Sequence, residues 1–100
     1  MNKTEHLLTC LTEECSEVQK AAAKALRFGL DDCTPNGSTN NAEDIVAEIH
    51  DLLAIIEMLK DANIIPDTTP NNAEQLVHMK KEKVIKYMDY AIKQGTLQNK

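Results

Sequence analysis

Hydrophobic residues recur every three or four positions in three long segments of the chain, with polar residues between them. This spacing is the period of α-helices that bury one side. The segments cover about residues 4–28, 41–62 and 72–94. Each begins near an Asn that lies three residues before a Glu, a relative of the capping box at helix N-termini. The three pairs are Asn2 and Glu5, Asn40 and Glu43, and Asn71 and Glu74. The pattern predicts an all-α fold with three main helices.

Glycines and prolines mark the ends of these helices. Gly29 and Gly95 follow the first and third segments, where a residue free to adopt positive φ favours a C-terminal cap. Residues 34–38 have the composition of a turn, and Pro66 and Pro70 separate the second and third segments. We therefore expect an antiparallel hairpin of the first two helices, followed by the third helix, in a single domain spanning residues 1–100.

The apolar stripes of the first two helices are expected to form the core. The first stripe contains Leu7, Leu8, Leu11, Cys15, Val18, Ala22, Ala25 and Leu26, with Cys10, Ala21 and Phe28 extending it on one side. The second contains Ile45, Ile49, Leu52, Leu53, Ile56 and Leu59, with Ile55 beside them. Because aromatic residues make up only 3% of the chain, this core must be aliphatic.

The helices are long for a chain of 100 residues. At ~1.5 Å per residue the first helix would be ~37 Å long. A compact domain of this size has a diameter of about 26 Å. Slim helices of this length would leave apolar surface exposed in a monomer. The sequence therefore predicts a homodimer or a higher homo-oligomer in which helices of several chains complete the bundle.

Charge, hydropathy and cysteine content exclude several functional classes. The formal net charge is −5, and residues 1–71 alone carry −8, which argues against the cationic surface needed for nucleic-acid binding. The longest apolar run is five residues, 52–56, so we expect neither a membrane span nor a secretory signal. Cys10 and Cys15 lie about 140° apart on one helix and cannot pair, which favours reduced thiols and a cytoplasmic protein.

Four carboxylates interrupt the apolar stripes. Glu14 falls within the apolar arc of the first helix and Glu17 at its border, whereas the neighbouring Glu13 points to solvent. On the second helix, Glu48 lies among apolar residues and Asp51 at the edge. Glu14 with Asp51, and Glu17 with Glu48, have residue numbers that sum to 65, so a hairpin folded near residues 32–33 brings all four acids together.

Four ionised carboxylates brought together in this way repel one another. The repulsion energy exceeds the net free energy of unfolding of most domains. Protonation or a hard divalent cation could neutralise them, and an all-oxygen site favours Mg²⁺ or Mn²⁺ over zinc. A di-iron site would need Glu-x-x-His on two helices, whereas His50 follows Glu48 by two residues and faces away. Simple solvation is the alternative, because acids at this spacing are common on exposed helix faces.

The segments Glu14-Cys15-Ser16-Glu17 and Glu48-Ile49-His50-Asp51 resemble the E-x-x-E and E-x-x-D signature of the MazG-like all-α nucleoside triphosphate pyrophosphohydrolases, a superfamily that also holds dimeric dUTPases. The resemblance covers about residues 10–60. Within it, residues 24–31 are similar to a stretch in short, phage-type members. The polar loop of roughly a dozen residues is a departure, since it is longer than a tight hairpin turn.

This resemblance implies that the chain hydrolyses a nucleoside or deoxynucleoside triphosphate to the monophosphate and pyrophosphate. The implied Mg²⁺ ligands are Glu14, Glu17, Glu48 and Asp51. Glu14 or Glu17 would also orient the attacking water. An anionic substrate needs cationic and aromatic partners, and the candidates are Lys24, Arg27, Lys80, Lys83 and Tyr87. The alternative role of the lysines is to keep the protein soluble, and that of the aromatic residue is to pack in the core. The alternative function for the whole chain is a non-catalytic helical dimerisation or adaptor module.

Overall fold

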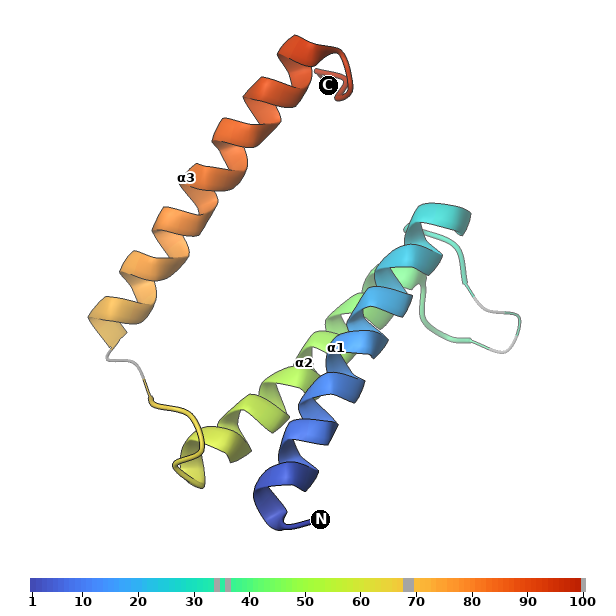
Figure 1. Cartoon of the computed structure of the whole chain (residues 1–100). Coiled ribbons are helices and arrows are strands. Elements are labelled where there is room, and N and C mark those ends of the chain that lie inside the picture. Colours follow the sequence, from blue (N-terminus) through green and yellow to red (C-terminus); the bar gives the residue numbers. More distant parts are fainter. Residues whose placement is uncertain (34, 36, 68–69, 100) are drawn as a thin grey trace. The chain divides into compact units, whose positions relative to one another are not determined.

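The structure consists of helices joined by loops (Figure 1). It is a computed structural model that describes residues 1–33, 35, 37–67 and 70–99, with the backbone alone at 70 and 71. The helices are α1 (Lys3–Phe28), α2 (Asn41–Asp61) and α3 (Pro70–Gln94). Within the described ranges there is no β-strand, only one isolated bridge between Cys33 and Asn40. The predicted all-α class is therefore confirmed.

The chain divides into two compact units, Met1–Pro66 with α1 and α2, and Asp67–Lys100 with α3. In the first unit, the chain passes along α1 and returns along α2, which packs beside it (Figure 1). The second unit is a single helix with a short C-terminal segment. No helix in the described part of the chain is both long and apolar enough to span a lipid bilayer.

Capping boxes start the first two helices, as their sequences predict. The Asn2 Oδ1 atom accepts a hydrogen bond from the backbone N–H of Glu5 at 2.8 Å, and the Glu5 carboxylate accepts one from Asn2 N–H. Asn40 and Glu43 form the same reciprocal pair at the start of α2. The third helix differs from the prediction, since it begins at Pro70. Proline suits a first helical turn because the missing N–H has no helical partner there. The side chain of the expected cap at position 71 lies outside the described residues.

The ends of α1 and α3 have the predicted glycine caps. Gly29 adopts a φ of 96° and its N–H donates to the Ala25 carbonyl at 2.8 Å, and Gly95 adopts a φ of 80°. Asn63 closes α2 with a φ of 57°, and the Ile64 N–H donates back to the Leu59 carbonyl. Asparagine tolerates this left-handed conformation better than most residues.

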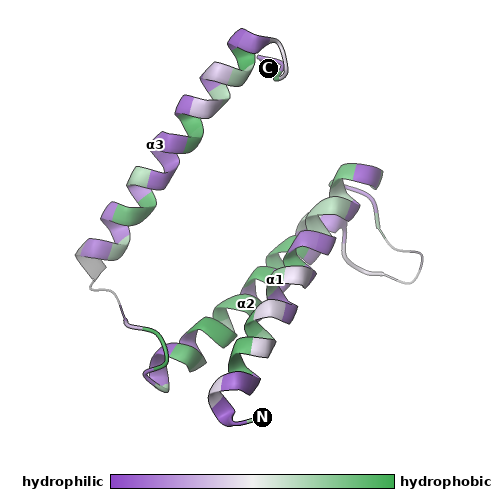
Figure 2. Ribbon diagram, viewed as in Figure 1, coloured by the Kyte–Doolittle hydropathy of each residue, from purple (hydrophilic) through white to green (hydrophobic). Residues whose placement is uncertain are grey.

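Few side chains are buried, and most of those lie where α1 meets α2. Leu7 and Ala25 on α1 and Leu59 on α2 are the buried hydrophobic residues of the described chain. Hydrophobic residues run along much of α2 (Figure 2). The half-buried positions of α1 are Cys10, Leu11, Glu14, Val18, Ala21 and Lys24. The contact face of α1 is therefore turned toward Cys10 and Ala21, at one side of the predicted stripe.

Several residues expected in the core are exposed. On α1 they are Leu8, Cys15, Ala22 and Leu26, and on α2 they are Ile49 and Leu53. The exposed fraction reaches 88% at Leu26. The physical reason is that each apolar arc is wider than the strip that one neighbouring helix covers. Within the first unit, α1 and α2 therefore leave part of their apolar surfaces uncovered by each other.

Hydrogen bonds close the base of the loop between α1 and α2. The Ala42 N–H donates to the Leu30 carbonyl at 3.0 Å, and the Asn41 N–H donates to the Asp32 carbonyl at 2.9 Å. The side-chain amide of Asn41 donates to the Gly29 carbonyl at 2.8 Å. Of the turn expected over residues 34–38, positions 34 and 36 lie outside the described residues. These bonds join the end of α1 directly to the start of α2.

In the second unit, α3 is exposed along most of its length. Its large exposed hydrophobic side chains are Leu76, Val77, Met79, Val84, Ile85, Tyr87, Met88 and Tyr90. His78 and Glu82 lie one helical turn apart, with 2.8 Å between Nε2 and Oε1. Beyond Gly95 the chain turns back, and the Thr96 N–H donates to the Ala91 carbonyl at 3.0 Å.

Candidate metal centre

Three carboxylates converge between α1 and α2. Glu14, Glu48 and Asp51 each offer an oxygen atom within 4.8 Å of the other two. Glu14 and Glu48 are half-buried, and Asp51 is exposed. These three residues, here called the acid triad, therefore sit at the edge of the helix contact with one side open to water.

The helical repeat explains why two acids face the helix contact. Glu14 comes seven residues after the buried Leu7, so both side chains lie on the same face of α1. Glu48 comes seven residues after the buried Asn41 and eleven before Leu59, which places it on the contact face of α2. Both positions would hold apolar residues in a helix pair that served packing alone.

The carboxylates of the triad lie close to further acidic residues. Burial raises the pKa of the Glu48 carboxyl above its ordinary value of 4.5, and neighbouring carboxylates raise it further. In order of effect, these neighbours are Asp51, Glu17, Glu14 and Asp44. The site thus favours a bound proton or cation.

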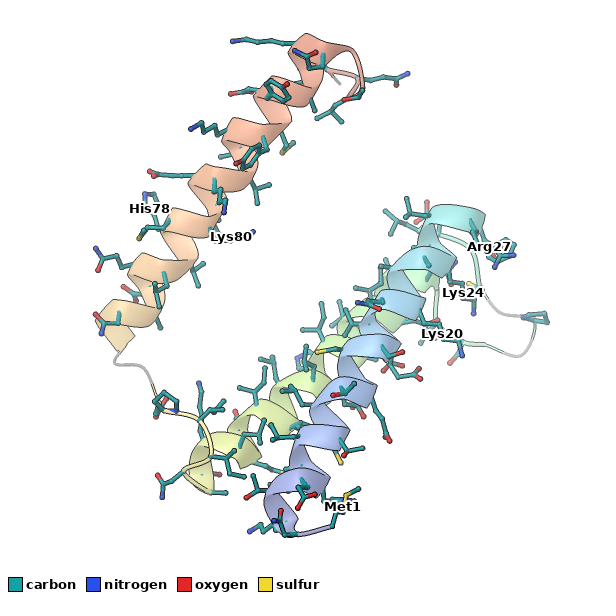
Figure 3. The ribbon with its side chains drawn as sticks, viewed as in Figure 1. Met1, Lys20, Lys24, Arg27, His78 and Lys80 are labelled. Atoms are coloured by element: carbon teal, nitrogen blue, oxygen red, sulfur yellow. The ribbon has the colours of Figure 1, made fainter. Side chains whose placement is uncertain are left out.

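Glu17 stands outside the triad and lines an adjoining cleft of about 190 Å³. The lining residues are Glu17, Lys20, Ala21, Lys24, Asp44, Ala47 and Glu48. Lys20 and Lys24 follow one another along the later turns of α1, with Arg27 beyond them (Figure 3). Because Glu48 belongs to both the triad and the cleft, an anion near the lysines would lie next to a cation at the triad.

Two residues of the cleft, Lys20 and Asp44, are missing from the sequence-based site. Lys20 lies one turn after Glu17, and Asp44 lies one turn before Glu48, so the helical repeat alone could have identified both. Asp44 also accepts a hydrogen bond from the Thr39 hydroxyl at 2.7 Å. That bond fixes the carboxylate at the start of α2.

The other expected substrate residues are not among those that line this cleft. The Arg27 guanidinium stacks over the Phe28 ring, 4.9 Å from its centroid, and neither residue lines the cleft. Lys80, Lys83 and Tyr87 line a groove within the second unit, together with Val84, Met88, Ala91 and Leu97. Of the proposed cationic residues in the first unit, the structure therefore groups Lys24, and not Arg27, with the acids.

The donor set of the triad suits a hard cation. It consists of carboxylate oxygens, and the nearby His50 is exposed, with Nδ1 2.9 Å from the Val46 carbonyl of its own helix. The three cysteines are free thiols. Mg²⁺ typically takes one or two protein carboxylates and completes its octahedral shell with water and substrate phosphates. The residues present fit this requirement and leave coordination positions open.

Comparison of the chain with models of protein families, with curated proteins and with solved structures finds no match. Evidence for function therefore comes from the chemistry of the chain's own residues.

Proposed function

We propose that this protein is a Mg²⁺-dependent pyrophosphohydrolase that converts a nucleoside or deoxynucleoside triphosphate to the monophosphate and pyrophosphate. The observation that carries the proposal is the convergence of Glu14, Glu48 and Asp51 from two helices, beside a cleft that holds Lys20 and Lys24. An acid triad next to two lysines suits a triphosphate bound together with a cation. The resemblance of residues 10–60 to MazG-like enzymes supports the same reaction.

In the proposed mechanism, the acid triad would hold Mg²⁺, with Glu17 as a further ligand on the cleft side. When bound, Mg²⁺ (or Mn²⁺) would neutralise phosphate oxygens and so favour attack by water. The Glu17 or Glu14 carboxylate accepts a hydrogen bond from the nucleophilic water and orients it. Water adds at the α-phosphorus and loses a proton to the carboxylate that orients it. The bond from that phosphorus to the oxygen bridging the α- and β-phosphorus atoms breaks, and pyrophosphate leaves with that oxygen.

The lysines of the cleft are proposed to bind the phosphates. Lys24 is half-buried, and Lys20 lies one turn before it on the same helix. Charge-assisted hydrogen bonds from both ammonium groups would oppose the repulsion between substrate and acids. Four further residues are proposed to bind substrate because of their charge or aromatic character, namely Arg27, Lys80, Lys83 and Tyr87. No step of the mechanism depends on them.

We also propose a homodimer or higher oligomer in which partner helices complete the bundle. Exposed hydrophobic residues on both units support this proposal, among them Leu26, Leu53, Val84 and Tyr87. The acidic balance of the chain supports a free nucleotide, rather than a nucleic acid, as substrate. The free cysteines agree with a reducing location such as the cytoplasm.

The decisive experiment is a panel of nucleoside and deoxynucleoside triphosphates, including non-standard bases, incubated with the full chain and Mg²⁺. Chromatographic separation of products should show monophosphate and pyrophosphate from at least one substrate. The Glu48→Gln variant should lose this activity, whereas Glu13→Gln, which changes an exposed neighbour of the triad, should retain it. Release of orthophosphate alone, or no product from any triphosphate, would contradict the proposal.

The alternative function is a non-catalytic helical dimerisation or adaptor module. The extent of exposed hydrophobic surface on α3 favours it, because such a surface suits contact with another protein. A module of this kind would associate with its partner equally well with and without Mg²⁺. It would yield no pyrophosphate in the same panel.

A further inference from the structure

Asn41, at the start of α2, is the one buried polar residue among the side chains that the structure describes. Its exposed fraction is 1%. The side-chain amide donates to the Gly29 carbonyl at 2.8 Å, while the Oδ1 atom has no hydrogen-bond partner. An apolar side chain of similar volume would avoid the free-energy cost of burying this oxygen. Such a side chain could not form the hydrogen bond to the Gly29 carbonyl.

That bond connects the end of α1 to the start of α2. Gly29 is the C-cap of α1, held by its N–H to the Ala25 carbonyl at 2.8 Å. Asn41 is the first residue of α2, and its own N–H donates to the Asp32 carbonyl. The hydrogen bond therefore fixes the end of one helix against the start of the other. The bond joins the two helices directly and does not involve the loop residues between them.

We propose that Asn41 is a positioning residue that sets the register of α1 against α2 and so holds Glu14 close to Glu48. The inference rests on the proposed function of the acid triad. Glu48 follows Asn41 by two helical turns on the same face of α2. A slip of one residue moves a side chain ~1.5 Å along the helix axis and turns it by about 100°. Such a slip would carry the carboxylates away from a common cation.

The first test measures Mn²⁺ affinity of the full chain by electron paramagnetic resonance, below the unfolding temperature of every variant. Asn41→Ala removes the bond to Gly29, and Asn41→Asp keeps the size but replaces the donor with an acceptor. We expect either variant to bind Mn²⁺ roughly tenfold or more weakly, the usual effect of losing a residue that orients metal ligands.

Asn2→Ala is the matched control. It also removes an asparagine hydrogen bond at a helix start, that of Asn2 with the Glu5 N–H, but at the end of α1 remote from Gly29. It should lower stability and leave Mn²⁺ affinity near that of the parent. Equal affinity in parent and Asn41 variants would overturn the proposal.

The second test does not need metal binding. Nitroxide labels at the exposed positions Gln19 and Ala54, in a chain whose three cysteines are replaced, report the distance between α1 and α2 by pulsed electron resonance. The Asn41 variants should shift or broaden this distance, and Asn2→Ala should not. An unchanged distance in Asn41→Ala and Asn41→Asp overturns the positioning role whatever the affinity. A parent chain that binds no Mn²⁺ contradicts the proposed function, and the distances then decide the role of Asn41 alone.

Discussion

The carboxylates of Glu14 on α1 and Glu48 on α2 approach within 4.8 Å on the faces through which the two helices pack. Packing brings these side chains together, and their charges oppose that approach. The hairpin therefore contains a local conflict that protons or cations relieve. Its stability should respond to both in ways that a purely apolar helix contact would not.

Mg²⁺ should raise the melting temperature of the chain. A ligand that binds only the folded state at about 100 times its Kd adds about 2.7 kcal/mol to the free energy of unfolding. Thermal unfolding followed by circular dichroism, with EDTA or with millimolar Mg²⁺, measures the shift. Glu48→Gln should respond much less than the parent, and Glu13→Gln should respond fully. A parent chain whose melting temperature is the same in EDTA and Mg²⁺ would argue against a preformed site.

The stability of the metal-free chain should fall as pH rises above about 4.5. Because the pKa of Glu48 is raised by burial and by adjacent carboxylates, the folded state holds this proton more tightly than the unfolded chain does. The free energy of unfolding therefore decreases as pH rises from the ordinary pKa through the raised one. Urea unfolding in EDTA across this pH range tests the expectation.

Glu48→Gln provides the control for this pH dependence. The amide cannot titrate, so the variant should lose most of the decrease and be more stable than the parent at neutral pH without metal. Mg²⁺ affinity of the parent should rise over the same pH range, because cation and proton compete for one carboxylate. A stability profile that Glu48→Gln leaves unchanged would show that another group is responsible.

Removing a lysine of the cleft should weaken substrate binding and leave metal binding intact. Lys24→Gln or Lys20→Gln deletes one charge-assisted hydrogen bond to phosphate, for which we expect about a tenfold rise in KM. Steady-state kinetics with the best triphosphate of the panel measure KM and kcat separately. Lys3→Gln is the control, because it removes the same charge at an exposed position at the start of α1 that does not line the cleft. Equal KM values in the parent and both lysine variants would remove these residues from the site.

The sequence predicts part of the arrangement of these acids. The helical repeat places Glu14 and Glu48 among apolar residues, and a chain folded near residues 32–33 pairs Glu14 with Asp51 and Glu17 with Glu48. The structure brings Glu14, Glu48 and Asp51 together and leaves Glu17 beside them in the cleft. The exposure of Leu8 and Leu26 is not predictable in this way. A wide apolar arc does not specify which part of it meets the neighbouring helix, so the sequence pattern places more residues in the core than α2 can cover.

Leu59→Ala should be among the most destabilising substitutions in the hairpin. Leu59 is fully buried, with an exposed fraction of 0%, and the described chain has only two other buried hydrophobic residues. Truncating a buried leucine costs about 2–5 kcal/mol through lost burial and the cavity left behind. Met58→Ala changes its exposed neighbour and should cost far less. Chemical denaturation of both variants measures the difference, and similar losses would contradict the observed packing.

Self-association should bury the hydrophobic residues that the single chain exposes. Leu53 on α2 has an exposed fraction of 48% and Val84 on α3 of 44%, values that suit residues covered by partner helices. Sedimentation equilibrium should therefore give a mass of at least twice the 11.2 kDa of one chain. Replacing Leu53 or Val84 with Glu would bury a charge in the contact between chains. We therefore expect the dissociation constant of the oligomer to rise at least about tenfold, which corresponds to about 1.4 kcal/mol of association free energy. Gln19→Glu adds the same charge at an exposed polar position and should have little effect. A parent chain that sediments as a monomer would exclude the oligomer.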